Sequence, residues 1–481
     1  MTSTRSLADA AAALASTFSG ELLQPHDAGY DAARRVHNGL VDKRPALIAR
    51  CRGVADVVDA VKFGRELGLE VKVRGGGHNV AGRATVDNGL MIDLAPMKGI
   101  HVDPGGRTAR AQGGVTWAEL NRQTQLHGLA VTGGVVSTTG IAGLTLGGGI
   151  GWLMANHGLA LDNLRSVELV TAAGEVMQVG ADDHPDLFWA LRGGGGNFGV
   201  ATSFEYRLHL VGPMVTGGLL AHPIEHASET LRFFRDRTGS LADEHTLFAG
   251  LIHAPDGAKL AAMVTCHSGP LGAGEAAMQP LKDFGSPVLD ALGPIPYVRL
   301  NQMLDAAYPK GAFNYWKSSF LARLSDEAIG AMIDSYTRCP TPMCQLLIEH
   351  FHPNAAKTAS APGPRTPMCQ LLIEHFHGAA TRVGVSDTAF PLRAEGYNFL
   401  AVAQWTDPAI ADRCVAWVRQ AYSDMAPFCA AARYVNYLDD DDGDDPVAAA
   451  YGPNYRRLQQ LKAKYDPDNF FHLNQNIRPR R

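Results

Sequence analysis

The stretch VRGGGHNVAG, residues Val73–Gly82, places three consecutive glycines directly after a predicted strand. Apolar residues alternate with charged ones from Leu69 to Val73, as in a strand, and the apolar spacing from Val54 to Gly68 is helical. Successive glycines let neighbouring backbone N–H groups point into one concavity, where they can hold a pyrophosphate. The stretch therefore predicts a strand that ends in an anion-binding loop. The alternative is a glycine-rich turn that leaves His78 exposed to solvent.

Two further glycine-rich stretches follow, GGVVSTTGIAGLTLGGGIG at Gly133–Gly151 and RGGGGNFGV at Arg192–Val200. Of the 52 glycines in the chain, 27 lie between Arg74 and Val200. Glycine is costly inside regular structure, so this density indicates tight turns or close approaches of backbone to a ligand. Three such loops predict one long ligand that backbone approaches at several points.

Length and composition set the class of protein. A chain of 481 residues predicts two large domains, and 46% hydrophobic with 19% charged residues is typical of a globular protein. The net charge of −5 gives no excess of positive charge that would attract nucleic acid or an anionic membrane. No run of 18 apolar residues, the length that a membrane-spanning helix needs, occurs in the sequence. Seven scattered cysteines argue against a disulfide scaffold or a structural zinc site. We therefore expect a cytoplasmic protein whose partners include neither nucleic acid nor a membrane.

The N-terminal stretch Leu7–Phe18 predicts an alanine-rich helix. A signal peptide is the alternative, but Asp9 interrupts the apolar run and only Arg5 precedes it.

The chain changes character twice after the glycine-rich part. Residues 167–170 and 175–179 flank a short Ala-Ala-Gly turn and predict a hairpin. From about 211 to 433 glycine becomes sparse, and strand-like runs at 219–220, 247–252 and 259–264 alternate with helix-like stretches. Residues 434–481 are rich in aromatic and asparagine side chains. We expect a first domain over 1–210, a second α+β domain over 211–433, and a C-terminal segment, 434–481, that returns to the first domain.

One internal repeat lies in the second domain. TPMCQLLIEHFH occurs identically at Thr341–His352 and at Thr366–His377. Repeat folds need three or more stacked copies, so two identical copies predict a local duplicated insertion, residues 341–365, instead. We expect the second copy to occupy the sheet, because it leads directly to the strand-like stretch Tyr397–Trp405.

A GxGxxG pattern at Gly194, Gly196 and Gly199 is a weak dinucleotide signal. It follows the helix-like PDLFWALR instead of a strand, and no acidic residue about 20 positions later completes a βαβ unit. The chain contains neither a GxxxxGK[ST] nor a GxSxG motif.

The combination of VRGGGHNVAG, GLMIDL, GLTLGGGIGWL, HGLALDN and DLFWALRGGGGNFGV with the closing YVNY, YGPNYRRL, KYDPDNFF and NQNI resembles one family. It is similar to the FAD-linked oxidases of the vanillyl-alcohol oxidase / para-cresol methylhydroxylase superfamily, in the berberine-bridge-enzyme-like branch that includes nicotine oxidases. The resemblance implies an α+β fold, with a two-part FAD-binding domain of the PCMH type and an inserted α+β substrate domain whose antiparallel sheet covers the flavin.

The resemblance also implies how FAD is held. His78 matches the histidine that bonds covalently to the flavin 8α-methyl group, and Val136 stands where many members carry a second linkage through cysteine, so we expect one covalent bond. The other expected cofactor contacts are Arg74, Gly75, Gly76, Gly77, Asn79, Gly82, Gly133, Thr138, Thr139, Gly140, Gly143, Gly148, Gly149, Gly151, Gly199, Val200, Asn436, Asn474 and Asn476.

For catalysis, the resemblance implies proton abstraction from a substrate O–H or N–H, hydride transfer to the flavin, and reoxidation by O2. Tyr437 matches the family tyrosine used as a base, and Glu374 lies where the nicotine-oxidase branch keeps acidic residues facing substrate. A phenol with a pKa near 10 is a poor base unless a neighbouring cation or hydrogen bonds favour phenolate. The alternative is that Tyr437 only packs at the domain junction.

Two clusters admit metal-binding alternatives. Alternation along QLLIEHFHG places Gln370, Leu372, Glu374 and Phe376 on one face of a strand, and His375 with His377 on the other. Two histidines without a third ligand make a weak case for a metal, so we expect none. The acidic run from Asp439 to Asp445 has no EF-hand spacing, and we expect a solvated loop that steers cationic substrates.

Two rivals to the oxidase remain: a dehydrogenase that uses another electron acceptor, and a flavin-binding protein that the insertion has made inactive. Amines, alcohols, sugars and polyketides are all substrates on this scaffold, so the sequence names a small-molecule substrate without specifying it. We expect a monomer or a homodimer.

Overall fold

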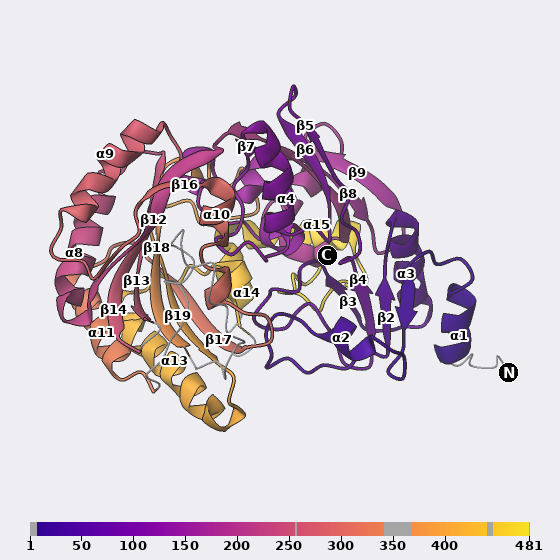
Figure 1. Cartoon of the computed structure of the whole chain (residues 1–481). Coiled ribbons are helices and arrows are strands. Elements are labelled where there is room, and N and C mark those ends of the chain that lie inside the picture. Colours follow the sequence, from indigo (N-terminus) through magenta and orange to yellow (C-terminus); the bar gives the residue numbers. More distant parts are fainter. Residues whose placement is uncertain (1–6, 255–256, 341–367, 440–445, 481) are drawn as a thin grey trace.

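A computed structural model of the chain describes residues 7–254, 257–340, 368–439 and 446–480. Figure 1 shows two lobes: the chain builds most of the first lobe, crosses into the second, and returns to the first with its C-terminal segment. The first lobe here means the described residues of 7–211 and 434–480, and the second means the described residues of 214–428. None of the helices in the described residues has the length and hydrophobicity needed to cross a membrane.

A small mixed sheet of the first lobe carries the loop of interest. Its strand order is β1-β2-β4-β3, with β1 antiparallel to β2 and the other pairs parallel. The predicted helix and the strand after it are both confirmed, as α3 and β3. The elements of this part are α1 (Leu7–Leu14), β1 (Glu21–Leu23), α2 (Tyr30–Arg34), β2 (Leu47–Arg50), α3 (Val54–Glu66), β3 (Val71–Arg74) and β4 (Leu90–Asp93).

A five-stranded antiparallel sheet, β5-β6-β10-β8-β9, completes the first lobe. The predicted hairpin is confirmed as β8 and β9. The elements are β5 (Ile100–Asp103), β6 (Thr108–Gln112), α4 (Trp117–Thr124), η1 (Gln125–His127), β7 (Leu129–Ala130), α5 (Ile141–Leu146), α6 (Met154–His157), η2 (Ala160–Asn163), β8 (Leu164–Val170), β9 (Val176–Gly180), α7 (Pro185–Leu191), η3 (Gly195–Asn197), β10 (Val200–Arg207) and β11 (His209–Leu210).

The second lobe is built on an antiparallel sheet of order β15-β12-β14-β13-β18-β19-β17, with β16 also paired to β12. Its strands are β12 (Met214–Pro223), β13 (His245–His253), β14 (Lys259–His267), β15 (Leu289–Asp290), β16 (Gly293–Pro296), β17 (Phe313–Leu321), β18 (Met368–Phe376) and β19 (Gly396–Trp405). The helices are η4 (Ile224–His226), α8 (Ala227–Thr238), α9 (Leu271–Lys282), α10 (Tyr297–Gln302), η5 (Asp305–Ala307), α11 (Asp326–Thr337), α12 (Ala379–Arg382), η6 (Pro408–Ile410), α13 (Ala411–Met425) and η7 (Ala426–Phe428).

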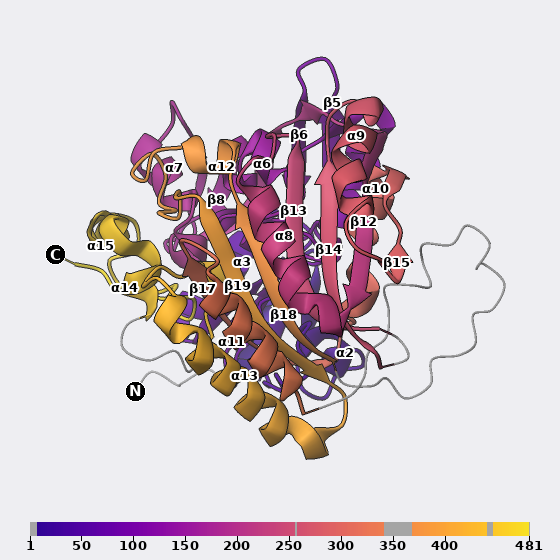
Figure 2. The same cartoon turned by 90° about the vertical axis from the view of Figure 1, so that its left-hand side faces the viewer.

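The two faces of this sheet have different neighbours. Helices α8, α11 and α13 lie across its outer face (Figure 2), where alternate strand residues such as Leu371, Ile373 and Phe399 pack against them. The residues between these point inward, toward the first lobe, as the period-2 geometry of a strand requires. The inner face of the sheet is therefore available to form a site with the glycine-rich loops.

The second copy of the repeat supplies a central strand of this sheet. Strand β18 pairs with β13 on one side and with β19 on the other, with Glu374 opposite Phe248 and Asn398. The first copy at Thr341–His352 and the insertion 341–365 lie outside the described residues, as do residues 440–445 of the acidic run.

A buried lysine of the C-terminal segment forms an ion pair within that segment and connects it to the rest of the first lobe. This segment contains η8 (Val435–Tyr437), α14 (Pro446–Tyr451), η9 (Gly452–Asn454) and α15 (Tyr455–Tyr465). Lys462 and Asp466 are both inaccessible to solvent, and their Nζ and Oδ2 atoms lie 2.6 Å apart. Lys462 also donates to the backbone carbonyls of Asn197 and Phe471, so one ammonium group connects the third glycine loop to the chain end.

Replacing Lys462 with methionine should destabilise the protein by about 3–5 kcal/mol, because Asp466 would keep a buried charge without its partner. The free energy of unfolding in urea is the measurement. Lys464→Met is the matched control, since Lys464 pairs with Asp186 at the surface and its loss should cost less than about 1 kcal/mol. Equal effects of the two substitutions would contradict this account of the chain end.

Candidate functional site

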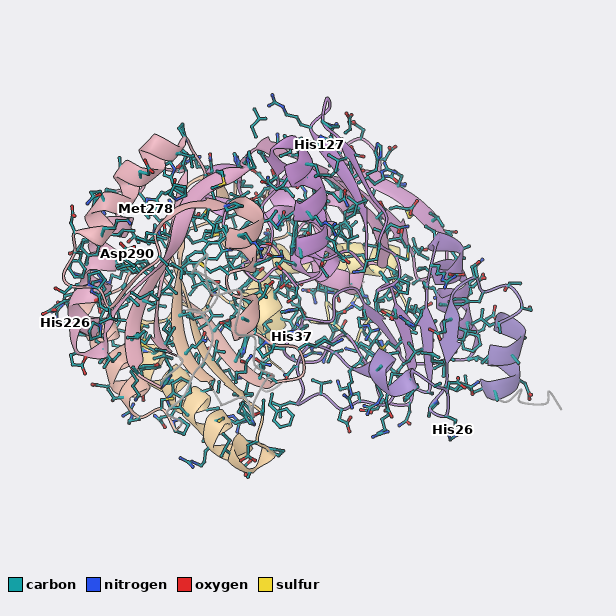
Figure 3. All side chains as sticks on the ribbon, viewed as in Figure 1. His26, His37, His127, His226, Met278 and Asp290 are labelled. Atoms are coloured by element: carbon teal, nitrogen blue, oxygen red, sulfur yellow. The ribbon has the colours of Figure 1, made fainter. Side chains whose placement is uncertain are left out.

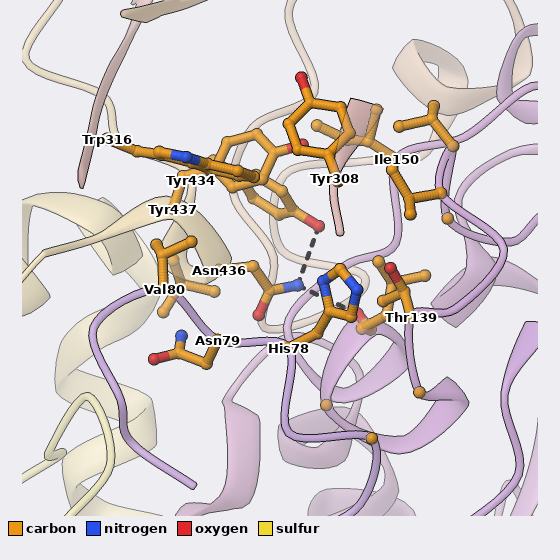
Figure 4. Close-up of a pocket in the computed structure, with 18 of the residues that line it drawn as sticks. His78, Asn79, Val80, Thr139, Ile150, Tyr308, Trp316, Tyr434, Asn436 and Tyr437 are labelled. Atoms are coloured by element: carbon orange, nitrogen blue, oxygen red, sulfur yellow. Dashed lines mark hydrogen bonds between the residues drawn. The ribbon is translucent and has the colours of Figure 1, made fainter. Parts of the chain in front are cut away.

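A cavity lies between the glycine-rich loops of the first lobe and the inner face of the second-lobe sheet. It has a volume of about 320 Å³, within the range of small-molecule and cofactor sites. Figure 4 shows His78 and Asn79 on one side of this cavity and the rings of Trp316 and Tyr308 on the other.

Two glycine loops touch at one point on the cavity wall. A Cβ atom on Gly76 would lie 2.4 Å from the backbone nitrogen of Gly140, and one on Gly140 would lie 2.4 Å from that of Gly76. Gly77 follows with a φ of 68°, a conformation that favours glycine. Backbone without side chains therefore forms this part of the cavity wall.

His78 lies beside the loop Gly133–Gly140 and is oriented by it. Its Nε2 atom is 3.0 Å from Thr138 Oγ1, and its ring stacks on that of His37 with centroids 3.8 Å apart. Figure 3 labels His37, which lies at the junction of the two lobes and accepts a backbone hydrogen bond from Gly311. Burial, together with His37, holds the pKa of His78 well below 6.5. The imidazole is therefore neutral at physiological pH.

The second lobe holds the loop that orients His78. The Asp305 carboxylate accepts hydrogen bonds from the backbone N–H and the hydroxyl of Ser137, at 2.7 and 2.5 Å. Asn301 donates to the carbonyl of Gly134 at 2.8 Å. The position of Thr138, and with it the His78 ring, thus depends on residues more than 150 positions later in the chain.

Not every expected cofactor contact lines the cavity. Those that do are Gly75, Gly76, Gly77, His78, Asn79, Thr139, Gly140, Gly143, Gly199, Val200, Asn436 and Asn474, and Tyr437 and Glu374 line it too. The expected contacts outside its lining are Arg74, Gly82, Gly133, Thr138, Gly148, Gly149, Gly151 and Asn476.

The residues outside the lining shape the walls instead. Arg74 forms a buried ion pair with Asp93 at the ends of two adjacent strands, so its charge is directed away from the cavity. Gly151 has no room for a Cβ atom against the carbonyl oxygen of Gly133. The N–H of Gly149 donates to the hydroxyl of Tyr434. Thr138 reaches the cavity only through His78.

Arg83 is a cavity residue that the sequence analysis missed. Its guanidinium donates to the backbone carbonyl of Asn474 at 2.9 Å, and Asn474 donates to the carbonyl of Gly196. Among the described residues, Arg83 is the only lysine or arginine that lines the cavity. The sequence did contain a signal for this residue, because a basic side chain follows closely after a glycine-rich loop.

Glu374 is buried in the inner face of the sheet. Its carboxylate accepts hydrogen bonds from Asn398 Nδ2 at 2.7 Å and from the Tyr437 hydroxyl at 3.3 Å. Burial raises the pKa of Glu374 to about 7, although both hydrogen bonds act to lower it. Glu374 can therefore gain or lose a proton near neutral pH.

Tyr437 has surroundings that differ from those a phenolate base requires. Burial and the Glu374 carboxylate raise the pKa of Tyr437 well above 10, and its hydroxyl donates to Glu374. Among the described lining residues, Arg83 is the only lysine or arginine that could stabilise a phenolate. It lies on the wall that Asn474 and the glycine loops form. Tyr437 by itself stays protonated.

Three further side chains complete this end of the cavity. The Tyr308 hydroxyl donates to Gln370 at 2.8 Å, and the Trp316 ring packs edge to face against Tyr308 and Tyr437. These contacts join the residue after η5 to β17, β18 and η8, which are distant in the sequence. Alternation in β17 and β19 indicates which residues face inward, but only the strand register shows that Asn398 lies opposite Glu374.

The histidines after Glu374 lie on the other face of β18. The rings of His375 and His377 stack with centroids 4.4 Å apart, as the predicted alternation requires. In the portion of the chain that the structure describes, no group of three or more His, Cys, Asp or Glu side chains could hold a metal. Val136 lines the cavity, whereas the described free cysteines Cys51, Cys266, Cys339, Cys414 and Cys429 do not.

Comparison with known proteins connects these features to a family. A family model described as "FAD binding domain" matches residues 45–180, and one described as "Berberine and berberine like" matches residues 433–478. The chain is 31% identical to an FAD-linked oxidoreductase of Dictyostelium discoideum, over 90% of this chain and 89% of that one. It is 30% identical to (R)-6-hydroxynicotine oxidase of Paenarthrobacter nicotinovorans, over 96% and 97%.

A solved structure also matches nearly the whole chain. The crystal structure of 6-hydroxy-D-nicotine oxidase from Arthrobacter nicotinovorans superposes with a TM-score of 0.84 at 28% identity, covering 96% of this chain and 98% of that one.

The contact between the two glycine loops yields a test. Gly76→Ala should push the loops apart and destabilise the protein by about 1–3 kcal/mol, because its Cβ atom meets backbone. Gly143→Ala is the control: Gly143 lines the same cavity, but its Cβ atom would meet nothing within 4 Å. Unfolding in urea measures both. An unchanged stability for Gly76→Ala would show that the loops separate freely.

Proposed function

Because the chain belongs to the FAD-linked oxidoreductases of the berberine-bridge-enzyme-like family, we propose that it is an oxidase acting on a small alcohol, amine or sugar-like molecule. The membership confirms the predicted family and α+β fold. When bound, FAD would supply the acceptor for a hydride from the substrate, and O2 would be the final electron acceptor in this proposal. We propose that a monomer or homodimer suffices, because one chain contributes both walls of the cavity.

The cavity fits FAD at the loop side. A dinucleotide brings a pyrophosphate, and backbone N–H groups of a glycine loop with a nearby cation suit such an anion. The Gly76–Gly140 contact, the Asn474 side chain and the Arg83 guanidinium provide these elements. Gly199, with a φ of 155°, and Val200 would complete this wall.

His78 is the residue we propose for covalent attachment. A neutral imidazole nitrogen is a nucleophile, and the low pKa of His78 keeps the ring neutral. Thr138 engages Nε2, which leaves Nδ1 without a hydrogen bond to any described residue. Val136 carries no thiol, so the proposed number of covalent bonds is one.

His78→Ala should abolish covalent flavin, whereas Thr138→Val should retain part of it, because Thr138 only orients the ring. The measurement is flavin absorbance and in-gel fluorescence after acid precipitation and washing. Covalent flavin that persists in His78→Ala would assign the attachment to another side chain.

The hydrogen bond between Tyr437 and Glu374 is the observation that carries the proposed chemistry. The Tyr437 hydroxyl donates to a carboxylate whose pKa lies near 7. We propose that the Tyr437 oxygen accepts the substrate proton while Tyr437 passes its own proton to Glu374. This relay needs no stable phenolate, which the raised pKa of Tyr437 would disfavour. Asn398 holds the other carboxylate oxygen in place.

The relay predicts a pH profile. Glu374 must be ionised to accept a proton, so anaerobic flavin reduction should accelerate as pH rises through about 7 and level off above it. Tyr437→Phe and Glu374→Gln should each slow flavin reduction by about 10²–10⁴-fold. Glu374→Gln should also abolish the dependence of the reduction rate on pH. Stopped-flow bleaching of the flavin with a substrate panel measures the rate, and admission of air then tests O2 as acceptor.

Covalent flavin content serves as the control, since neither variant touches His78. Near-normal reduction by Tyr437→Phe would exclude the relay through this residue. Rapid bleaching followed by very slow recovery in air would identify a dehydrogenase.

A further inference from the structure

The ring of His37 covers one face of the His78 imidazole. The two rings stack with centroids 3.8 Å apart and an interplanar angle of 25°. At its edge, the His78 ring has one further restraint, the contact of Nε2 with Thr138 Oγ1 at 3.0 Å. A single hydrogen bond fixes one atom but leaves the ring free to turn about that contact. Packing against the ring face is what removes this freedom.

His37 is itself fixed by backbone hydrogen bonds to both lobes. Its N–H donates to the carbonyl of Gly77 at 2.9 Å, and its carbonyl accepts from the N–H of Gly311 at 2.8 Å. Gly77 directly precedes His78 in the first glycine loop, whereas Gly311 lies just before β17 in the second lobe. The His37 side chain is buried between them, with 5% of the residue exposed. The place of its ring is therefore set by the docking of the two lobes.

The two residues after His37 continue this connection. Asn38 Nδ2 donates to the carbonyls of Val80 and Asn314 at 2.7 and 2.8 Å, and Asn38 Oδ1 accepts from the N–H of Asn314 at 2.9 Å. A Cβ atom on Gly39 would lie 2.2 Å from the carbonyl oxygen of Gly311. This short segment thus lies tightly between the lobes and cannot shift without breaking several hydrogen bonds.

The His37 ring offers His78 a face and no proton transfer. Its Nε2 atom is buried without a hydrogen-bond partner among the described residues. Burial, together with Lys310, lowers the pKa of His37 to about 4, so the ring is neutral at physiological pH. A base must place a nitrogen within hydrogen-bond reach of the proton that it removes, and stacked rings do not. Contact between the two ring faces is therefore the interaction that His37 supplies.

We propose that His37 is a positioning residue for the covalent attachment of FAD, because its ring holds the His78 imidazole with Nδ1 directed into the cavity. The inference rests on the attachment at His78 proposed above. It goes beyond that proposal by assigning a role to a residue that lies outside the glycine-rich motifs and outside the cavity lining.

The attachment reaction makes two demands on the direction of the His78 ring. The Nδ1 lone pair forms the bond to the flavin 8α carbon, and the Nε2 proton leaves toward Thr138 Oγ1. One C–H proton leaves the 8α carbon, and the electron pair of the broken bond stays on the flavin until O2, the proposed acceptor, removes it. A ring that turned about the Thr138 contact would keep the path for the Nε2 proton but would direct Nδ1 away from its target.

Two substitutions of His37 test this role through flavin content instead of turnover. His37→Ala should bind flavin but attach it at least about tenfold more slowly, since a small misplacement of a reacting group can cost about 10²-fold in rate. His37→Phe should retain most of the attachment, because a phenyl ring supplies the face without any nitrogen. In-gel fluorescence of samples taken during expression reports the rate, and absorbance before and after acid precipitation gives the ratio of covalent to total flavin.

His157→Ala is the matched control. His157 stacks on His209 with centroids 3.9 Å apart, and neither residue lines the cavity, so this variant loses a stacked imidazole but should attach flavin at the wild-type rate. Wild-type attachment in His37→Ala would overturn the inference. Equal loss in His37→Phe and His37→Ala would also overturn it, because the imidazole nitrogens would then be the groups required. A wild-type protein without covalent flavin would refute the attachment at His78 itself, and the inference with it.

Discussion

The backbone contact between Gly76 and Gly140 is the constraint on which the site depends. Two loops from different parts of the first lobe can approach this closely only because neither carries a side chain at the contact. Their approach sets Thr138 beside His78, and the His78 ring then faces the cavity. The second lobe adds the other half of the restraint, because Asp305 holds Ser137 and Asn301 holds Gly134. The loop that orients His78 is thus held from both lobes.

Burial then separates the electrostatic roles of the two cavity walls. On the loop side, the backbone of the glycine loops and the Arg83 guanidinium together suit an anion. The His78 imidazole there stays neutral beside His37. On the sheet side, the low-dielectric surroundings bring the pKa of Glu374 close to 7 and push that of Tyr437 upward. A carboxylate and a phenol joined by a hydrogen bond can share a proton at lower cost than either could ionise alone in that environment.

The same pair explains how substrate binding and proton removal can be connected. Tyr437 both lines the cavity and donates its hydroxyl hydrogen to Glu374. A positive charge that a substrate brought beside this pair would stabilise the ionised form of Glu374, since an opposite charge nearby lowers the pKa of a carboxyl group. Such a substrate would favour the protonation state that the relay requires.

The sequence by itself determined the local features whose causes are local. Glycines after a strand predicted the loop that carries His78, and period-2 alternation placed Glu374 and His375 on opposite faces of β18. The tertiary structure decided the rest. Arg74 lies in the glycine motif, yet the buried Asp93 on the adjacent strand pairs with its charge. Asn398 and Trp316 carry no motif and reach the site only through strand register and the meeting of the two lobes. Such contacts depend on residues far apart in the chain, and no pattern in a local stretch of sequence encodes them.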